Sequence, residues 1–132
     1  MSAWDHYVTY LQQQAPGNCI GGAIFGLDGT QWAASDDCRM TDPSQASKVA
    51  NAFSSVGSSF TLAAGKFMIL RADNDPAEGN LASFYARCGA KGLICVKTGQ
   101  LIVCGEHEQD VTRNATETAV YNLGNYLISN GY

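Results

Sequence analysis

The sequence of 132 residues has no long apolar run, few charged side chains and only 8 Lys and Arg. A helix that spans a bilayer needs ~20 consecutive apolar residues, so no membrane-spanning helix is predicted. The first residues carry no basic segment followed by an apolar stretch, and we expect no secretory signal. Charged residues make up 15% of the chain and the formal net charge is −4. This balance disfavours nucleic-acid binding, for which a basic surface is typical.

The chain also lacks a Cys-x-x-Cys pair, although it contains 5 cysteines. An odd number of cysteines without a secretory signal favours reduced thiols in the cytoplasm over a disulfide framework. Cys95 and Cys104 lie inside apolar runs, so we expect them to be small buried core residues.

Sequence motifs for enzymatic chemistry are missing as well. There is no Gly-x-Ser-x-Gly elbow, no P-loop and no Gly-x-Gly-x-x-Gly fingerprint. Gly21-Gly22 lacks the spacing of a phosphate loop and instead predicts close packing of a helix on a sheet. No catalytic residue and no cofactor are expected.

Metal-binding patterns are incomplete. Cys104 and His107 have the spacing of two zinc ligands, but no second pair with matching spacing follows. His107 stands between two glutamates and is predicted to be an exposed loop residue. The acidic stretch around Asp73 and Asp75 lacks the spacing of a calcium loop and is predicted to be a solvated loop. No metal site is therefore expected.

Apolar periodicity predicts a helix near each end of the chain and a short one between them. The first contains Trp4, Tyr7, Val8 and Leu11 and is ended by Pro16-Gly17. A short helix follows Asp42-Pro43, with an apolar stripe of Ala46, Val49, Ala50 and Phe53. The last helix is expected from about residue 110 to residue 129, with a buried stripe of Thr116, Ala119, Val120, Leu123 and Leu127.

Short apolar segments joined by turns predict antiparallel strands. These are residues 19–26 and 31–35 around an Asp-Gly turn, 60–64 and 67–71 around Gly65-Lys66, then 81–88, 92–97 and 100–105. Several strands are apolar at nearly every position, so both faces of the sheet should be covered. The predicted fold is a single α+β domain over residues 1–132: a central antiparallel sheet with the N- and C-terminal helices on one face and the short helix on the other.

The informative residues are aromatic: Trp4 and Tyr7 on the first helix, Trp32 on an early strand, and Tyr126 and Tyr132 near the end of the chain. Two terminal helices side by side on the sheet should bring Trp4, Tyr7, Tyr126 and Tyr132 close together. Parallel ridges of such rings fit a polyproline II helix, whose carbonyls accept hydrogen bonds from indole and phenol groups. The pattern indicates a groove for proline-rich peptides, with ordinary core packing as the alternative.

Segments along the whole chain, in order, resemble the profilin family. They are SAWDHYV at 2–8, GLDGTQWA at 26–33, GKFMILRAD at 65–73, GLICVKT at 92–98 and LGNYLI at 123–128. The resemblance implies a profilin-like fold and a non-enzymatic protein of the cytoplasm and cytoskeleton. Such a protein binds monomeric actin and proline-rich segments such as those of formins, and regulates actin polymerisation and nucleotide exchange. It also implies phosphoinositide binding, which the scarcity of basic residues predicts to be weak.

The resemblance carries site residues over by position. The polyproline groove would comprise Trp4, Tyr7, Trp32, Tyr126 and Tyr132. The actin contacts would be Lys66, Ile69, Arg71, Arg87, Val111, Thr112, Arg113, Glu117 and Thr118. For Ile69 and Val111 a core position is the alternative. Residues 74–82 form a longer loop than in compact members of the family, near Arg71 and Arg87.

Other function classes stay open. A sheet covered by helices on both faces also fits a small trafficking or GTPase-binding adaptor that does not bind actin. A thiol enzyme is a further alternative, with Cys88 as its nucleophile, because Arg87 and Lys91 lie nearby and neighbouring cations activate a thiol.

Overall fold

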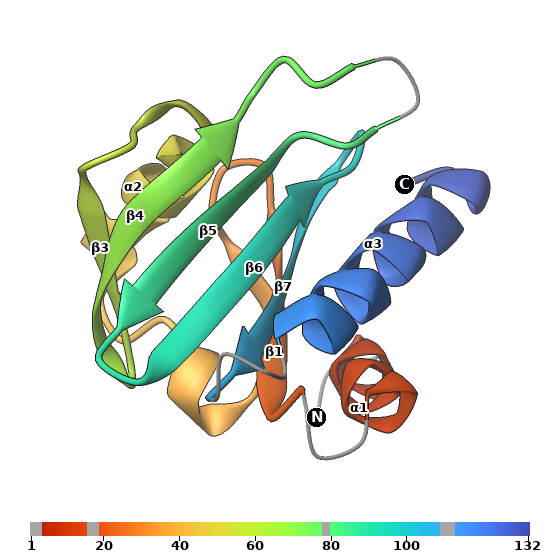
Figure 1. Cartoon of the computed structure of the whole chain (residues 1–132), viewed down its shortest axis with the longest axis horizontal. Helices are drawn as coiled ribbons and strands as arrows, with labels where there is room; N and C mark the ends of the chain where they lie inside the picture. Colours follow the sequence, from red (N-terminus) through yellow and green to blue (C-terminus); the bar gives the residue numbers. More distant parts are fainter. Residues whose placement is uncertain (1–3, 16–18, 78–79, 109–112) are drawn as a thin grey trace.

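The computed structural model describes residues 4–15, 19–77, 80–108 and 113–132. A 7-stranded sheet forms the centre of the molecule (Figure 1). The strand order is β2-β1-β7-β6-β5-β4-β3, and all neighbouring pairs are antiparallel. The strands are β1 (Gly21–Gly26), β2 (Gln31–Ala34), β3 (Ser59–Leu62), β4 (Gly65–Asp73), β5 (Ser83–Cys88), β6 (Lys91–Lys97) and β7 (Leu101–His107).

Helices cover both faces of this sheet. The first and last helices, α1 (Asp5–Gln14) and α3 (Arg113–Ser129), lie side by side on one face (Figure 1). The opposite face carries α2 (Ala46–Ala50) with the short 3-10 turns η1 (Asp36–Cys38), η2 (Pro43–Gln45) and η3 (Ala52–Ser54). Two buried clusters, one under each layer, form the core. The predicted arrangement of layers is thus confirmed.

The packing of α1 and α3 follows the predicted pattern. The stripe of α3 predicted from Thr116 to Leu127 is buried, as are Val8 and Leu11 of α1. Gly105 of β7 lets α3 approach closely, because a Cβ there would collide with the Val120 side chain. A Cβ on Gly22 would lie 3.0 Å from Leu11 Cδ1 and collide with the Cys104 carbonyl. Both glycines therefore set the height of the helices above the sheet.

Local signals placed most turns correctly. The Asp-Gly turn lies between β1 and β2, and Gly29 has a positive φ of 86°. The Asp42 side chain caps η2 by accepting a hydrogen bond from the Ser44 N–H. The turn predicted at Gly65-Lys66 is wrong by two positions: residues 63–64 make the turn and Gly65 begins β4. The predicted stop of the first helix at Pro16-Gly17 lies outside the described residues.

His107 is a second correction, because it is fully buried rather than exposed in a loop. Strand β7 runs to His107, two residues beyond the predicted strand, and pairs His107 with Gly92 of β6. Alternation along β7 turns Gly105 and His107 to the face covered by α3. Cys104 belongs to the core cluster of the opposite face, so it and His107 cannot ligate one zinc ion.

No helix in the described part of the chain is long and apolar enough to cross a bilayer.

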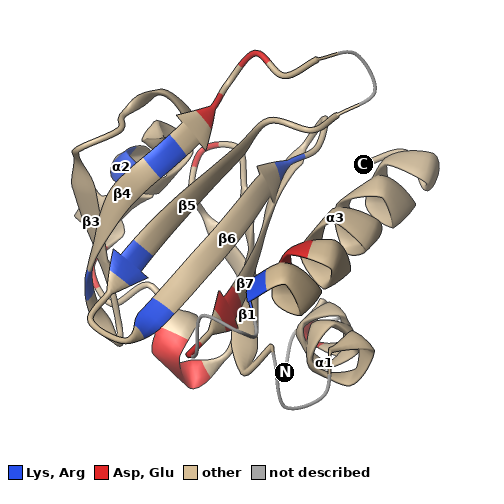
Figure 2. Cartoon of the chain, in the orientation of Figure 1, with Lys and Arg blue, Asp and Glu red and all other residues tan. Residues whose placement is uncertain are grey.

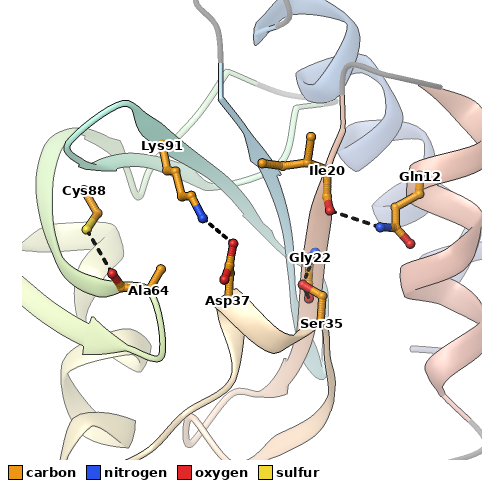
Figure 3. Close-up of polar contacts among 8 residues, drawn as sticks. All are labelled: Gln12, Ile20, Gly22, Ser35, Asp37, Ala64, Cys88 and Lys91. Atoms are coloured by element: carbon orange, nitrogen blue, oxygen red, sulfur yellow. Dashed lines mark hydrogen bonds and ion pairs between the residues drawn. The ribbon is translucent and has the colours of Figure 1, made fainter.

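A buried carboxylate lies between β7 and η1. Glu106 is 1% exposed, and its Oε2 has no hydrogen-bond partner among the described residues. Burial, and secondly the charge of Asp37, raise the Glu106 pKa to about 7, although Lys91 acts in the opposite direction. Lys91 forms an ion pair with Asp37 (Figure 3). Nearby, Ser35, the residue before η1, bonds to Gly22 of β1, and Gln12 of α1 bonds to Ile20, the residue before β1.

We predict that Glu106 makes the fold less stable as pH rises. The pKa of Glu106 in the folded chain, about 7, exceeds the ordinary value of 4.5. The contribution of this side chain to the free energy of unfolding is therefore fully present below pH 4.5 and is lost as pH rises through about 7. Glu106→Gln removes this loss, and should raise the free energy of unfolding at pH 8 by about 1–3 kcal/mol. Urea unfolding of the wild type and the variant at pH 5 and pH 8 measures this difference in the free energy of unfolding. An unchanged pH dependence in the variant would contradict the assignment, and Glu108→Gln, at an exposed neighbour, is the control.

Candidate functional site

An aromatic cluster forms where α1, the end of α3 and β2 meet. Trp4 is at its centre: its ring centroid lies 5.2 Å from Tyr7, 5.0 Å from Trp32 and 4.9 Å from Tyr132. Tyr126 joins through Tyr7, at 6.5 Å. The structure therefore brings together all the aromatic residues predicted to line a peptide groove. We call these rings the aromatic strip.

The rings of the strip come from separate parts of the chain. Tyr7 follows Trp4 by three residues and so lies on the same side of the helix. Trp32 lies on the edge strand β2, and Gly26 of β1 leaves room for its indole, since a Cβ there would lie 3.1 Å from Nε1. The strip is thus built from three elements, held together by the packing of α1 and α3 on the sheet.

Tyr132 is held in place by the β6–β7 turn. The Thr98 hydroxyl donates to the Tyr132 backbone oxygen at 3.1 Å, and the Gln100 side chain donates to the Gly131 carbonyl at 3.2 Å. The same Thr98 oxygen accepts the Leu101 N–H at 2.9 Å. A buried hydroxyl therefore couples the turn of a distant hairpin to the position of Tyr132.

The strip remains open to solvent. Trp4, Tyr7, Trp32 and Tyr132 are partly buried, and Tyr126 is 52% exposed. Burial, followed by the charges of Tyr126 and Tyr132, raises the pKa of Tyr7, so its hydroxyl is a neutral donor at physiological pH. Exposed ring faces edged by N–H and O–H donors suit an apolar ligand that carries unpaired carbonyls.

Beside the strip, a cavity of about 300 Å³ opens between α1 and α3. Its lining residues are His6, Tyr7, Tyr10, Leu123 and Tyr126. The sequence analysis missed His6 and Tyr10. Their spacing of four residues on the first helix was the signal available, because it places both on one side of that helix.

A family model described as Profilin matches residues 2–132. The chain belongs to the profilin family. It is 31% identical to Profilin-A of Physarum polycephalum, over 98% of this chain and 99% of that protein. The structure of Acanthamoeba castellanii profilin IA superposes with a TM-score of 0.77, at 32% identity, over 98% of this chain and 100% of the other. Mouse profilin IIa, solved in complex with a double repeat from the FH1 domain of mDia1, shares the fold at 19% identity, with a TM-score of 0.69 and coverage of 99% and 100%.

Lys and Arg positions of this chain occur on β4, β5 and β6 and at the start of α3 (Figure 2). Lys66 and Arg71 are exposed on β4, and Arg87 is partly buried on β5. Strand pairing sets Met68 opposite Arg87 and Arg71 opposite Tyr85, so these side chains share the face on which α3 lies. A bulge between Ile69 and Arg71 shifts the pairing of β4 with β5, and this shift sets Arg71 opposite Tyr85. We call Lys66, Arg71, Arg87 and Arg113 the cationic face.

Two arginines of the cationic face contact a polar network on the same face of the sheet. The Arg87 Nη1 donates to the Tyr85 hydroxyl at 3.0 Å, and that hydroxyl lies 3.0 Å from His107 Nε2. Arg113, at the start of α3, places its guanidinium 3.8 Å from the centre of the Tyr85 ring. Tyr85 therefore contacts two arginines of this chain, one on β5 and one on α3, and His107 holds the Tyr85 hydroxyl. Neither Tyr85 nor His107 was predicted as part of a site, since only strand register brings them together.

The other residues carried over for actin contact fall in different places. Ile69 is 1% exposed and packs in the core under α2, so its side chain is not available to a partner of this profilin. Glu117 is partly buried and Thr118 exposed on α3. Val111 and Thr112 lie outside the described residues. Met68 and Leu70, 41% and 51% exposed on β4, are apolar surface that the sequence analysis missed.

We predict that the Thr98 hydroxyl keeps Tyr132 against Trp4. Thr98→Val preserves the shape but leaves the buried Leu101 N–H without its hydroxyl acceptor, which should cost about 1–3 kcal/mol in the free energy of unfolding. It should also increase the quenching of tryptophan fluorescence by acrylamide, because Tyr132 no longer covers Trp4. Thr98→Ser keeps the hydroxyl and is the control. A valine variant with wild-type stability and quenching would refute this role.

Proposed function

We propose that this chain is a non-enzymatic regulator of actin that binds proline-rich segments on the aromatic strip and monomeric actin on the cationic face. The observation that carries the proposal is the meeting of Trp4, Tyr7, Trp32, Tyr126 and Tyr132 in one open cluster, within a chain of the profilin family. Membership of the family implies a regulator that binds actin in the cytoplasm and the cytoskeleton.

The chemistry of the strip supports a proline-rich ligand. A polyproline II helix repeats every three residues, has no internal hydrogen bonds and loses little conformational entropy on binding. Its pyrrolidine rings pack between aromatic ridges, while its carbonyls accept from the Trp4 indole or from tyrosine hydroxyls. The complex of mouse profilin IIa with an FH1 repeat shows that one protein of this fold holds such a segment.

The cationic face suits a large acidic partner. Lys66, Arg71, Arg87 and Arg113 concentrate positive charge on a chain with a net charge of −4, beside the exposed Met68 and Leu70. Apolar contact supplies affinity at a protein interface, and complementary charge supplies orientation and association rate. Binding here would alter nucleotide exchange on actin by favouring one conformation of the nucleotide cleft, without covalent chemistry.

Phosphoinositides are a weaker expectation for the same cationic face. Clusters of 4–8 Lys and Arg are typical of segments that bind such headgroups. The basic residues here are spread over β4, β5 and α3 rather than clustered in sequence. We therefore propose that lipid binding is secondary to actin binding.

Trp4→Ala should abolish oligoproline binding, with a loss of at least about 30-fold, because truncating a central aromatic anchor costs 2 kcal/mol or more. Actin affinity should change by less than about twofold, since Trp4 lies outside the cationic face. Fluorescence titration with a proline decamer, read from Trp32, measures the first affinity, and titration of labelled actin monomers measures the second. Trp4→Phe, which keeps a ring, should retain part of the proline affinity. Equal loss of both ligands by a folded Ala variant would contradict separate surfaces.

Arg71→Glu should weaken actin binding by about tenfold, chiefly through slower association, and the effect should shrink at high salt. Stopped-flow association with labelled actin monomers at two salt concentrations measures it. Lys48→Glu makes the same charge change at an exposed position of α2, on the opposite face of the sheet. Equal slowing by both substitutions would show that net charge, and not the cationic face, controls association.

A further inference from the structure

We propose that the cavity lined by His6, Tyr7, Tyr10, Leu123 and Tyr126 is an additional proline subsite, which takes the next turn of a proline-rich segment already seated on the aromatic strip. This inference rests on the proposed function, because it extends the same ligand along the same pair of helices.

The position of the cavity follows from how α1 and α3 run past one another. Tyr132 meets Trp4 at one end of the strip, and Tyr126 meets Tyr7 one step farther along. Tyr10 and Leu123 then come from the next turn of each helix, in the direction away from Trp4. Tyr7 and Tyr126 line both the strip and the cavity, so the two surfaces are continuous.

The lining fits an apolar ligand that carries carbonyl groups. Leu123 is fully buried, while Tyr7 and Tyr10 are partly buried and Tyr126 is more than half exposed. The His6 ring centroid lies 4.0 Å from that of Tyr7, which extends the aromatic surface over the edge of the cavity. The described lining residues include no Lys, Arg, Asp or Glu. An anionic or strongly charged ligand would find no counter-charge there.

The length of ligand that reaches the cavity can be estimated. From Trp32 through Trp4 and Tyr7 to Tyr126 the ring centroids are 5.0, 5.2 and 6.5 Å apart. A polyproline II helix rises ~3.1 Å per residue, so about six prolines cover the strip, and about two more span the ~5.4 Å helix turn to Tyr10. A proline-rich segment of about eight or more residues should therefore use both surfaces.

The test compares a proline hexamer with a proline dodecamer by titration of tryptophan fluorescence. A longer ligand also gains affinity from its larger number of binding registers, so the quantity compared is the dodecamer-to-hexamer affinity ratio in wild type and in variants. Tyr10→Ala should reduce this ratio by about fivefold to tenfold and leave hexamer affinity within twofold of wild type. His6→Ala, at an exposed position outside the core, should reduce it in the same direction.

The control is Tyr121→Ala, which removes a tyrosine of α3 that lines a different surface, with Asn114 and Glu117. It should leave the ratio unchanged. An unchanged ratio in both Tyr10→Ala and His6→Ala, with normal hexamer binding, would overturn the subsite alone. Loss of hexamer binding in Tyr10→Ala, with the ratio unchanged in His6→Ala, would also overturn it as a separate subsite. Failure of the wild-type protein to bind either peptide would overturn the proposed function itself, and the subsite with it.

Discussion

The close packing of α1 and α3 on one face of the sheet is the constraint on which the other features depend. It buries Val8 and Leu11 of one helix against the stripe of the other, over strands that present Gly22 and Gly105 to them. Burial of a large apolar side chain contributes about 1.5–3 kcal/mol, so this layer supplies much of the stability of the fold. The same packing sets Trp4 beside Tyr132, although these residues lie near opposite ends of the chain. The aromatic strip is therefore a surface consequence of core packing.

The helices α1 and α3 cover only part of the sheet face on which they lie. The covered part and the uncovered part carry two separate surfaces. Helix α3 packs on β6 and β7, which leaves the β4–β5 side of the face for Lys66, Arg71 and Arg87. Tyr85 lies at the boundary, where it contacts both Arg87 and Arg113 and its hydroxyl lies 3.0 Å from His107 Nε2. One sheet thus carries an aromatic surface and a cationic surface at separate places, as the proposal of two ligands requires.

Local sequence patterns predicted the features that depend on neighbouring residues alone. The helical stripe from Thr116 to Leu127, the Asp-Gly turn and the β6–β7 hairpin follow from periodicity and turn chemistry. The predicted packing of the terminal helices brought the rings of those helices together, and the family resemblance added Trp32. The burial of His107 depends on where β7 ends. The outward direction of Arg71, two residues after the inward Ile69, depends on a bulge in β4, and both features are set by pairing across the sheet. The hold of Thr98 on Tyr132 joins positions 34 residues apart, and no local signal encodes it.

In the proposed complex, one proline-rich ligand contacts rings from both ends of the chain at the same time. Isotope-filtered NMR of the protein bound to a proline decamer detects such contacts as intermolecular NOEs from proline side chains. We expect NOEs to Trp4, Tyr7, Trp32, Tyr126 and Tyr132 together, and none to the side chains of the cationic face. NOEs confined to another surface, or to Trp4 without Tyr132, would contradict the proposed complex.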